Sequence, residues 1–180
     1  MSENNNPAGI PLEADEKSMP VMVYTSDALI CGQIVTKQQL MAMRLLTGVS
    51  VPDYITVYQA QFIPVISGDL AQPINHAQTH LPTRLILGYH LLPPQTEPYD
   101  FDENELNRIM NPVTIKLGAF TFHAHVRISS HSSVSNYVSV VKADFIPVYD
   151  IEVIFPNTEK MPPIKTNMAI LRRENIYYFE

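Results

Sequence analysis

The chain has 180 residues, of which 46% are hydrophobic and 17% are charged, and its formal net charge is −6. Its longest apolar runs are far shorter than the roughly 18–20 residues of a membrane-spanning helix, and its polar N-terminus lacks the apolar stretch of a secretory signal. A single cysteine, Cys31, excludes an internal disulfide, so we expect a cytoplasmic protein without a membrane span.

The N-terminal part of the chain predicts a polar tail followed by a small β-rich unit. Residues 1–19 are acidic and include three consecutive asparagines, which indicates a disordered tail whose apolar residues 10–12 could anchor it on a neighbour. After the tail we expect strands at 21–24 and 28–35, a helix at 38–46, a strand at 54–65, a polar loop at 66–82 and a last strand or tight pair at 83–92. Thr36 is the predicted N-cap of the helix.

A linker and a second β-rich unit follow. Residues 93–111 combine prolines with acidic residues, as a linker does, and 102–110 could form one or two helical turns. For the second unit we expect strands at 113–116, 120–128, 145–155, 167–171 and 175–179, with a Pro-rich loop at 156–163. Residues 132–141 replace the helix of the first unit, but their many serines and valines make a helix doubtful.

The two units repeat one pattern. Residues 53–63 return as residues 144–154, a spacing of 144 − 53 = 91. At a spacing of 92, Gly32 lies opposite Ala124, and a small residue at this position suits a close backbone approach. The sequence therefore predicts an all-β protein with two tandem small β-barrel or β-roll domains, each of four to five strands with a short helical insertion. The expected boundaries are a tail at 1–19, domains at 20–92 and 112–180, and a linker at 93–111.

Charge is distributed unevenly between the two predicted domains. The 73 residues of the first domain carry six charged side chains, which are Lys37, Arg44, Arg84, Asp27, Asp53 and Asp69. Protein interfaces are depleted in lysine and acids and enriched in tyrosine and methionine, both frequent in this domain. The composition therefore predicts that the first domain is buried against another surface, as in a homo-oligomer.

Two segments of the second unit carry a resemblance to known proteins. They are Phe-Ile-Pro-Val-Tyr-Asp-Ile-Glu-Val at 145–153 and Asn-Met-Ala-Ile-Leu-Arg-Arg-Glu-Asn-Ile at 167–176. With the preceding strand pattern, they resemble an uncharacterised bacterial family of short β-barrel domains of Sm-like or SH3-like shape. The resemblance implies a barrel fold and a tendency to assemble, and it implies no catalytic motif.

Three histidines form the sharpest candidate for chemistry. His123 and His125 lie on one face of a predicted strand, where two imidazoles could hold a metal ion, with His131 or Asp144 as a third ligand. The equivalent residues of the first unit are Cys31 and Gln33, which argues against a shared metal site. We therefore assign no catalytic, cofactor-binding or metal-binding residue and no cofactor, and whether these histidines bind a metal stays open.

Enzymatic activity and nucleic-acid binding have little support. The run 129–133 places serines beside His131, but it lacks the glycines of a nucleophile elbow, and Cys31 reads as a core residue. The basic residues Lys160, Lys165, Arg172 and Arg173 form one small cluster, and a turn with solvated charges explains Arg172 and Arg173. The acidic tail and linker would repel a polyanion.

Self-assembly is the function that these patterns favour. We expect a non-enzymatic structural subunit that forms a homo-oligomer, as a ring or a filament, through heterologous contacts between its two β-domains. The alternatives are an adaptor or regulatory binding module for another protein and an Sm-like RNA-binding module.

Overall fold

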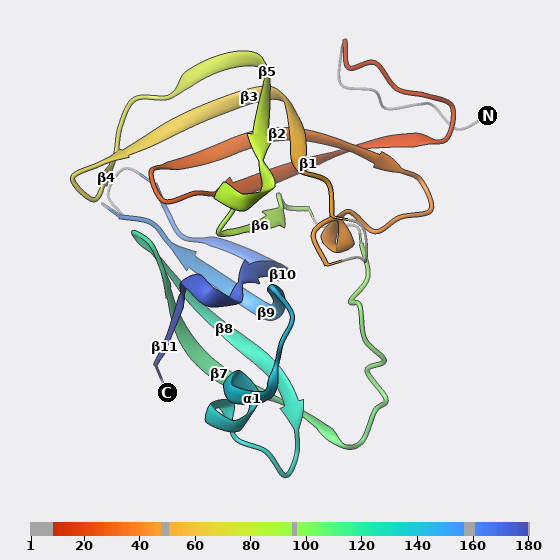
Figure 1. Cartoon of the computed structure of the whole chain (residues 1–180), viewed down its shortest axis with the longest axis vertical. Helices are drawn as coiled ribbons and strands as arrows, with labels where there is room; N and C mark the ends of the chain where they lie inside the picture. The colour runs from red at the N-terminus through yellow and green to blue at the C-terminus, as the bar shows by residue number, and fades with distance from the viewer. Residues whose placement is uncertain (1–8, 48–50, 95–96, 157–160, 180) are drawn as a thin grey trace.

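A computed structural model describes residues 9–47, 51–94, 97–156 and 161–179. In these ranges the chain forms one antiparallel sheet of 11 strands, with one α-helix and three 3-10 helices (Figure 1). The first half contains β1 (Glu16–Tyr24), β2 (Ala28–Lys37), η1 (Ala42–Arg44), β3 (Tyr54–Ile66), β4 (Asp69–Leu70), β5 (Ile74–Pro82), η2 (Thr83–Leu85) and β6 (Gly88–Leu91). The second half contains β7 (Arg108–Leu117), β8 (Phe120–Ser129), α1 (Val134–Val140), β9 (Phe145–Ile154), β10 (Ile164–Arg172), η3 (Arg173–Asn175) and β11 (Ile176–Phe179).

The strand order joins the two halves into a single sheet. It runs β11-β7-β8-β9-β10-β6-β1-β2-β3-β4, and β5 also pairs with β3. In each half the last strand returns to pair with the first, β6 with β1 and β11 with β7. The all-β prediction is therefore confirmed. Two separate tandem barrels are not confirmed, because β6 of the first half pairs with β10 of the second half and the described sheet stays open.

The backbone repeats as the sequence does. Gln59 on β3 and Asp150 on β9, which are 91 positions apart, both have a positive φ, of 49° and 46°. The register shifts at the same point in both halves, between Cys31 and Gln33 on β2 and between His123 and His125 on β8. A β-bulge with one residue in the left-handed region is thus present twice, which supports duplication of a single unit.

The small residue predicted opposite this bulge is explained by close packing. A Cβ atom added to Gly32 would lie 2.5 Å from Cγ1 of Val57 and 2.7 Å from the carbonyl oxygen of Tyr58. Side chains do not approach this closely, so β2 needs glycine here, as predicted. The second half accepts the methyl group of Ala124, which is buried.

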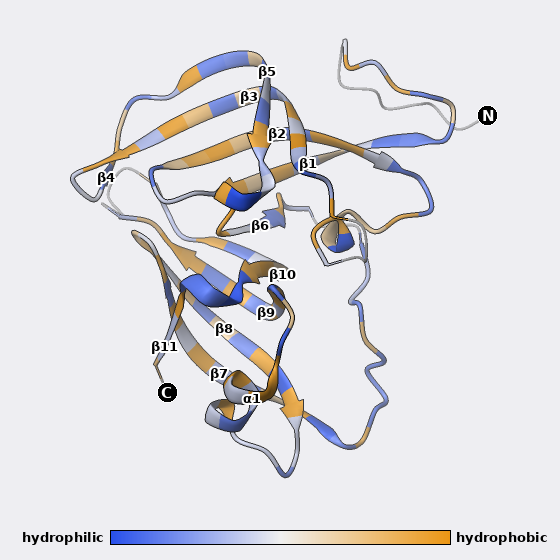
Figure 2. Ribbon diagram, viewed as in Figure 1, coloured by the Kyte–Doolittle hydropathy of each residue, from blue (hydrophilic) through white to orange (hydrophobic). Residues whose placement is uncertain are grey.

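The two halves complete each other's hydrophobic cores. On β1, Val21 and Val23 face the core of the first half, whereas Met22 and Tyr24 pack into the core of the second. In return, β9 and β10 contribute side chains to the first core, namely Phe145, Tyr149, Met168 and Ile170. The strands at the junction are consequently apolar on both faces where the halves meet (Figure 2).

The helical insertion of the first half is shorter than predicted. In place of a helix over 38–46, only Ala42–Arg44 form a 3-10 turn. Thr36 lies within β2, and its buried Oγ1 has no hydrogen-bond partner among the described residues, so its prediction as an N-cap is wrong. The insertion instead depends on a carboxylate that is distant in sequence.

That carboxylate belongs to Glu97, in the segment that connects the halves. The backbone N–H groups of Ala42 and Met43 donate to Glu97 at 2.8 and 3.2 Å, and Nζ of Lys17 lies 3.0 Å from it. A buried carboxylate with three donors is well compensated, and it fixes the connecting segment to the first half.

The connecting segment also contacts the second half, along the side of the molecule (Figure 1). The ring of Phe101 lies 4.4 Å from the guanidinium carbon of Arg127 and 4.9 Å from the ring centroid of Tyr149. Arg127 also forms an ion pair of 2.7 Å with Glu105. The helical turns predicted at 102–110 do not form, because residues 102–107 make only non-helical turns and β7 begins at Arg108.

Two further predictions need correction, and a third is only partly described. The segment 66–82 is not a loop, since it contains β4 and the nine-residue strand β5. The doubt about a helix at 132–141 is wrong, because α1 forms there and Oγ of Ser133 accepts a hydrogen bond from the N–H of Asn136 at 3.2 Å. Of the loop predicted at 156–163, residues 157–160 lie outside the described residues.

The predicted disordered tail overlaps with ordered structure. Residues 1–8 lie outside the described ranges, but β1 already begins at Glu16. Nζ of Lys37 lies 2.7 Å from Glu13, 3.0 Å from Asp15 and 3.3 Å from Glu16. Ile10, expected to contact a neighbour, is buried within its own chain. The acidic residues next to β1 are therefore paired with a lysine of β2.

Candidate functional site

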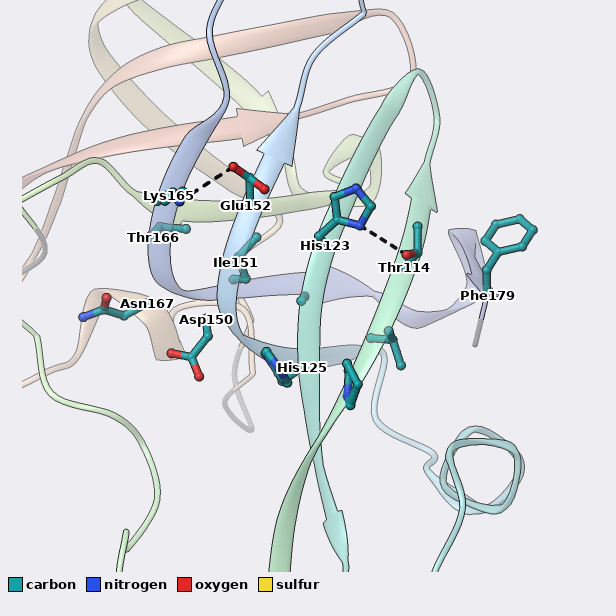
Figure 3. A pocket seen from close by; sticks show the side chains of 13 residues that line it. Thr114, His123, His125, Asp150, Ile151, Glu152, Lys165, Thr166, Asn167 and Phe179 are labelled. Carbon is teal, nitrogen blue, oxygen red and sulfur yellow. Dashed lines mark hydrogen bonds and ion pairs between the residues drawn. The ribbon is translucent and has the colours of Figure 1, made fainter.

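A hollow of about 670 Å³ lies on the polar face of the second half. Its walls come from four neighbouring strands, β7 to β10, and Phe179 of β11 lies at its side (Figure 3). The lining combines acidic, basic and neutral polar groups, which include Asp150, Glu152, Lys165, Thr114 and Asn167. Nζ of Lys165, which is largely exposed, lies 3.9 Å from the carboxylate of the half-buried Glu152.

His123 and His125 both line this hollow from β8, which confirms that they share a face. Nδ1 of His123 lies 3.2 Å from Oγ1 of Thr114 on the neighbouring strand (Figure 3). Nδ1 of His125 is buried and has no hydrogen-bond partner among the described residues. The two rings therefore differ in their surroundings, although only Ala124 separates them in the sequence.

The residues suggested as a third metal ligand do not join these histidines. His131 lies in the turn beyond the end of β8, and Asp144 precedes β9, where it lines a different depression together with Arg172. Among the described residues, no group of three or more histidines, cysteines and acids is arranged to hold a metal ion. The geometry of the described residues thus offers no metal centre.

Two tyrosine–aspartate hydrogen bonds join the connecting segment to β9 beside the hollow. The hydroxyl of Tyr99 donates to Oδ1 of Asp150 at 2.9 Å, and the hydroxyl of Tyr149 donates to Oδ1 of Asp100 at the same distance. Burial, followed by the hydrogen bond to Asp150, raises the pKa of Tyr99 to about 12. Burial and the charge of Asp100 raise the pKa of Tyr149 as well. These phenols remain protonated at neutral pH and act as donors that attach the connecting segment.

The basic cluster expected near the C-terminus does not form a patch. The guanidinium of Arg172 is mostly buried, where it donates to the carbonyls of Ile86 and Thr83 at 2.8 and 2.7 Å and lies over the ring of Phe145. Lys165 lies at the other end of β10, and Lys160 is outside the described residues. Arg172 therefore connects the halves, and the interpretation of Arg172 as a solvated turn residue is wrong.

The candidate nucleophiles, Cys31 and the serines of the run 129–133, lie in surroundings that explain them as structural residues. Burial raises the pKa of the Cys31 thiol to about 11, so the thiol is protonated at neutral pH. In the serine run, Ser133 caps α1, and Oγ of Ser129 accepts a hydrogen bond from the N–H of His131 at 3.4 Å. No helix in the described part of the chain is long and apolar enough to span a bilayer; α1 has seven residues.

The second candidate site is the free edge at β5. This strand pairs with β3 on one side, and no ladder is present on its other side among the described residues. Six of its nine residues are exposed, and its sequence, Ile-Asn-His-Ala-Gln-Thr-His-Leu-Pro, contains no lysine, arginine or acid. Exposed apolar side chains flank it: Tyr54 (53% exposed), Ile74 (50%) and Leu85 (49%).

Sequence reasoning missed this edge because residues 66–82 were interpreted as a loop. The repeat contains the signal that was needed. The β3–β5 ladder pairs Phe62 with Ile74, and the β9–β10 ladder pairs Val153 with Ile164. Extending the repeat past residue 154 would have predicted a strand at 74–82, as the equivalent in the first half of the strand predicted at 167–171.

At the other end of the sheet, β11 is a second edge. It has four residues, Ile-Tyr-Tyr-Phe, and within the described ranges it pairs only with β7. Tyr177 is 71% exposed and Phe179 is 53% exposed. The sheet thus ends in one long uncharged edge and one short aromatic edge, on different halves (Figure 1).

Comparison of the chain with protein-family models, with curated proteins and with solved structures finds no match. The resemblance to a family of short β-barrel domains therefore stays a prediction.

Proposed function

We propose that this protein is a non-enzymatic structural subunit that assembles with copies of itself by extending its β-sheet. The observation that carries the proposal is the edge strand β5, which is nine residues long, mostly exposed and free of formal charge. An unpaired strand edge presents backbone N–H and C=O groups to any strand that approaches.

Natural sheets protect such edges with lysines, inward-pointing charges, short strands or covering loops. In β5 none of the nine residues is lysine, arginine or acid, and proline occurs only at the last position, Pro82. The flanking apolar side chains of Tyr54, Ile74 and Leu85 add surface that a partner would remove from water. These features support sheet extension as the mode of contact.

The low charge of the first half gives weaker support than its composition implies. Part of its uncharged surface, around Met22 and Tyr24, packs against the second half of the same chain. The proposal therefore depends on the sheet edges, and growth beyond a dimer into a ring or filament needs the second edge, β11. Two tandem β-units then supply one edge each.

Light scattering at micromolar concentrations tests the proposal. We expect a mass that is a multiple of 20.3 kDa and that falls on dilution. A double variant tests the edge itself. Gln78→Lys combined with His80→Lys should dissociate the assembly, because both positions are exposed and like charges would lie together at the contact. Lysines at the exposed turn residues Ser130 and His131 are the matched control and should leave the mass unchanged.

A monomer at every concentration would refute self-assembly. The alternative, a binding module for a different protein, would use the same edge and predicts a monomer in isolation. The light-scattering result separates the two.

A further inference from the structure

We propose that β5 pairs antiparallel with β5 of a second copy, about a two-fold axis at Thr79, in the register that places Ala77 of one copy opposite Leu81 of the other. The inference rests on the proposed function and names its contact. It replaces the head-to-tail contact that the tandem repeat suggested with a symmetric one.

The template for this contact is the junction between the halves. There β6 adds to β10 antiparallel, with Tyr89 opposite Ile170 and Gly88 opposite Leu171. In the repeat, β10 is the equivalent of β5, so that Ile170 corresponds to His80 and Leu171 to Leu81. The edge that accepts a strand in the second half is therefore the edge that is unpaired in the first.

The junction shows what an added strand must provide. A Cβ atom built on Gly88 would lie 2.6 Å from Cδ2 of Leu171 and 3.0 Å from the carbonyl oxygen of Ile170. The backbones approach this closely because Gly88 has no side chain. A strand that adds beside Leu81 consequently needs a small residue at the facing position.

The other free edge, β11, does not meet this requirement. Gly88 pairs with Tyr24 on β1, and Tyr177 pairs with Lys116 on β7, which is the repeat equivalent of Tyr24. Tyr177 thus occupies the position of Gly88, and its ring would meet Leu81 of the next copy. The junction between the halves cannot recur head to tail in the same register.

Strand β5 does contain a suitable residue. Ala77 is its smallest side chain and is exposed. If Ala77 faces Leu81 of the second copy, two-fold symmetry places Leu81 opposite Ala77 of that copy, and Thr79 faces its own counterpart on the axis. Gln78 then pairs with His80 of the second copy, and His80 with Gln78.

This register agrees with the direction of the backbone groups. Pro147, opposite Ile170 on β9, has no N–H, which fits an Ile170 whose own N–H and C=O point towards β6. By the repeat, His80 and Gln78 direct theirs to the open side of β5. They become the hydrogen-bonded pairs of the new ladder, and Ala77, Thr79 and Leu81 form the pairs whose side chains lie closest.

The apolar surface next to β5 fits the same register. In this register residue 74 of one copy lies opposite residue 84 of the other. Ile74 of one copy therefore extends past Pro82, the last residue of β5 in the other copy, towards η2 of that copy. There Leu85 is 49% exposed, and Ile74 itself is 50% exposed. Two such contacts, one at each end of the symmetric ladder, would bury apolar side chains that the single copy leaves in water.

Cysteine cross-linking of the full chain tests the register. In Thr79→Cys, the two thiols on the axis should be oxidised by diamide to one disulfide, because facing residues of a non-hydrogen-bonded pair have close Cβ atoms. We expect the Thr79→Cys dimer to form at least 10-fold faster than the dimers of Gln78→Cys or Tyr177→Cys. Wild-type protein, whose single cysteine Cys31 is half-buried, is the control for background oxidation.

A second pair of variants tests the need for a small residue. Ala77→Val should weaken the dimer at least 10-fold in light scattering, whereas Ala77→Gly should leave it intact. Because Ala77 is exposed in the single copy, circular dichroism should show both variants folded. Self-association without preferential Thr79→Cys cross-linking would overturn this contact and leave the proposed function standing, whereas a monomeric wild type would overturn both.

Discussion

The first and second halves have the same strand pattern, but one face of the sheet is buried in the first half and exposed to solvent in the second. On β1 and β2 of the first half, this face carries Met22, Tyr24, Leu29 and Cys31, and the first three are buried in the core of the second half. The equivalent residues on β7 and β8 are Thr114, Lys116, Thr121 and His123, and they lie at the surface. One fold thus uses the same face as an internal contact and as a solvent boundary.

This difference explains why the first half carries so few charged residues. Its uncharged outer face is an interface, as composition predicted, but the partner is the second half of the same chain. The corresponding face of the second half carries polar residues and holds the polar hollow instead. Depletion of charge in one unit of a repeat therefore identifies a covered face without identifying what covers it.

The largest effect is expected from truncating one residue of each face. Tyr24→Ala should lower the free energy of unfolding by about 3–5 kcal/mol, because Tyr24 is fully buried against Phe120 and Phe122. Lys116→Ala, at the equivalent exposed position, should change it by no more than about 0.5 kcal/mol. Urea unfolding at pH 7 measures both, and equal losses would show that the two faces are not different.

The next effect is a pH dependence that only the first half should show. His90 is fully buried, and it corresponds to Phe179 in the repeat. Nδ1 of His90 donates to the carbonyl of Leu91, and Nε2 accepts from the hydroxyl of Tyr24, each at 2.8 Å. Burial lowers the pKa of His90 from 6.5 to about 4.

The sign of this dependence follows from proton binding. Between pH 6.5 and 4 the unfolded chain binds a proton at His90 that the folded chain does not, so stability falls as the pH falls through this window. The lowered pKa of His90 corresponds to about 3 kcal/mol of stability, which is present above pH 6.5 and lost towards pH 4. Urea unfolding between pH 7 and 4 measures it. In His90→Phe this part of the pH slope should disappear, and in the control His131→Gln it should remain.

A smaller effect is expected at the junction between the halves. Gly88→Ala places a methyl group against Leu171 and the backbone of Ile170, and should cost about 1–3 kcal/mol. Tyr177→Ala, at the equivalent position on the free edge β11, should be within about 0.5 kcal/mol of wild type. Thermal unfolding distinguishes these outcomes, and a tolerated Gly88→Ala would remove the packing argument for a small residue at such a junction.

The sequence predicts the strands well wherever the repeat and the β-branched residues agree. Residues 54–63 and 145–154 lie on β3 and β9, and even the position of the bulge, opposite Gly32 and Ala124, is marked by a small residue. Strand β5 was missed because its residues are polar, as an exposed edge allows, and so lack the alternation of a half-buried strand. Local pattern cannot show that a strand is an edge, since that depends on the order of distant strands.

The candidate sites could be predicted only in part. The shared face of His123 and His125 follows from the two-residue period of a strand, and their place in a hollow follows from four strands that come together only in the fold. The role of Arg172 was missed because its acceptors, the carbonyls of Thr83 and Ile86, are backbone groups distant in sequence. Backbone acceptors leave no signature in the amino-acid sequence.

The smallest effects separate the helical insertions of the two halves. In the second half, Ser133 caps α1 through its side chain, so Ser133→Ala should cost about 1 kcal/mol. In the first half, the hydroxyl of Thr36 is buried without a hydrogen-bond partner among the described residues, so it caps nothing. Thr36→Val keeps the shape and removes an uncompensated polar group, and should leave stability unchanged or raise it by up to about 1 kcal/mol. Chemical unfolding of both variants is the measurement. A loss of about 1 kcal/mol in Thr36→Val would mean that this hydroxyl has a partner after all, and that the first insertion is held from β2 as well as from Glu97.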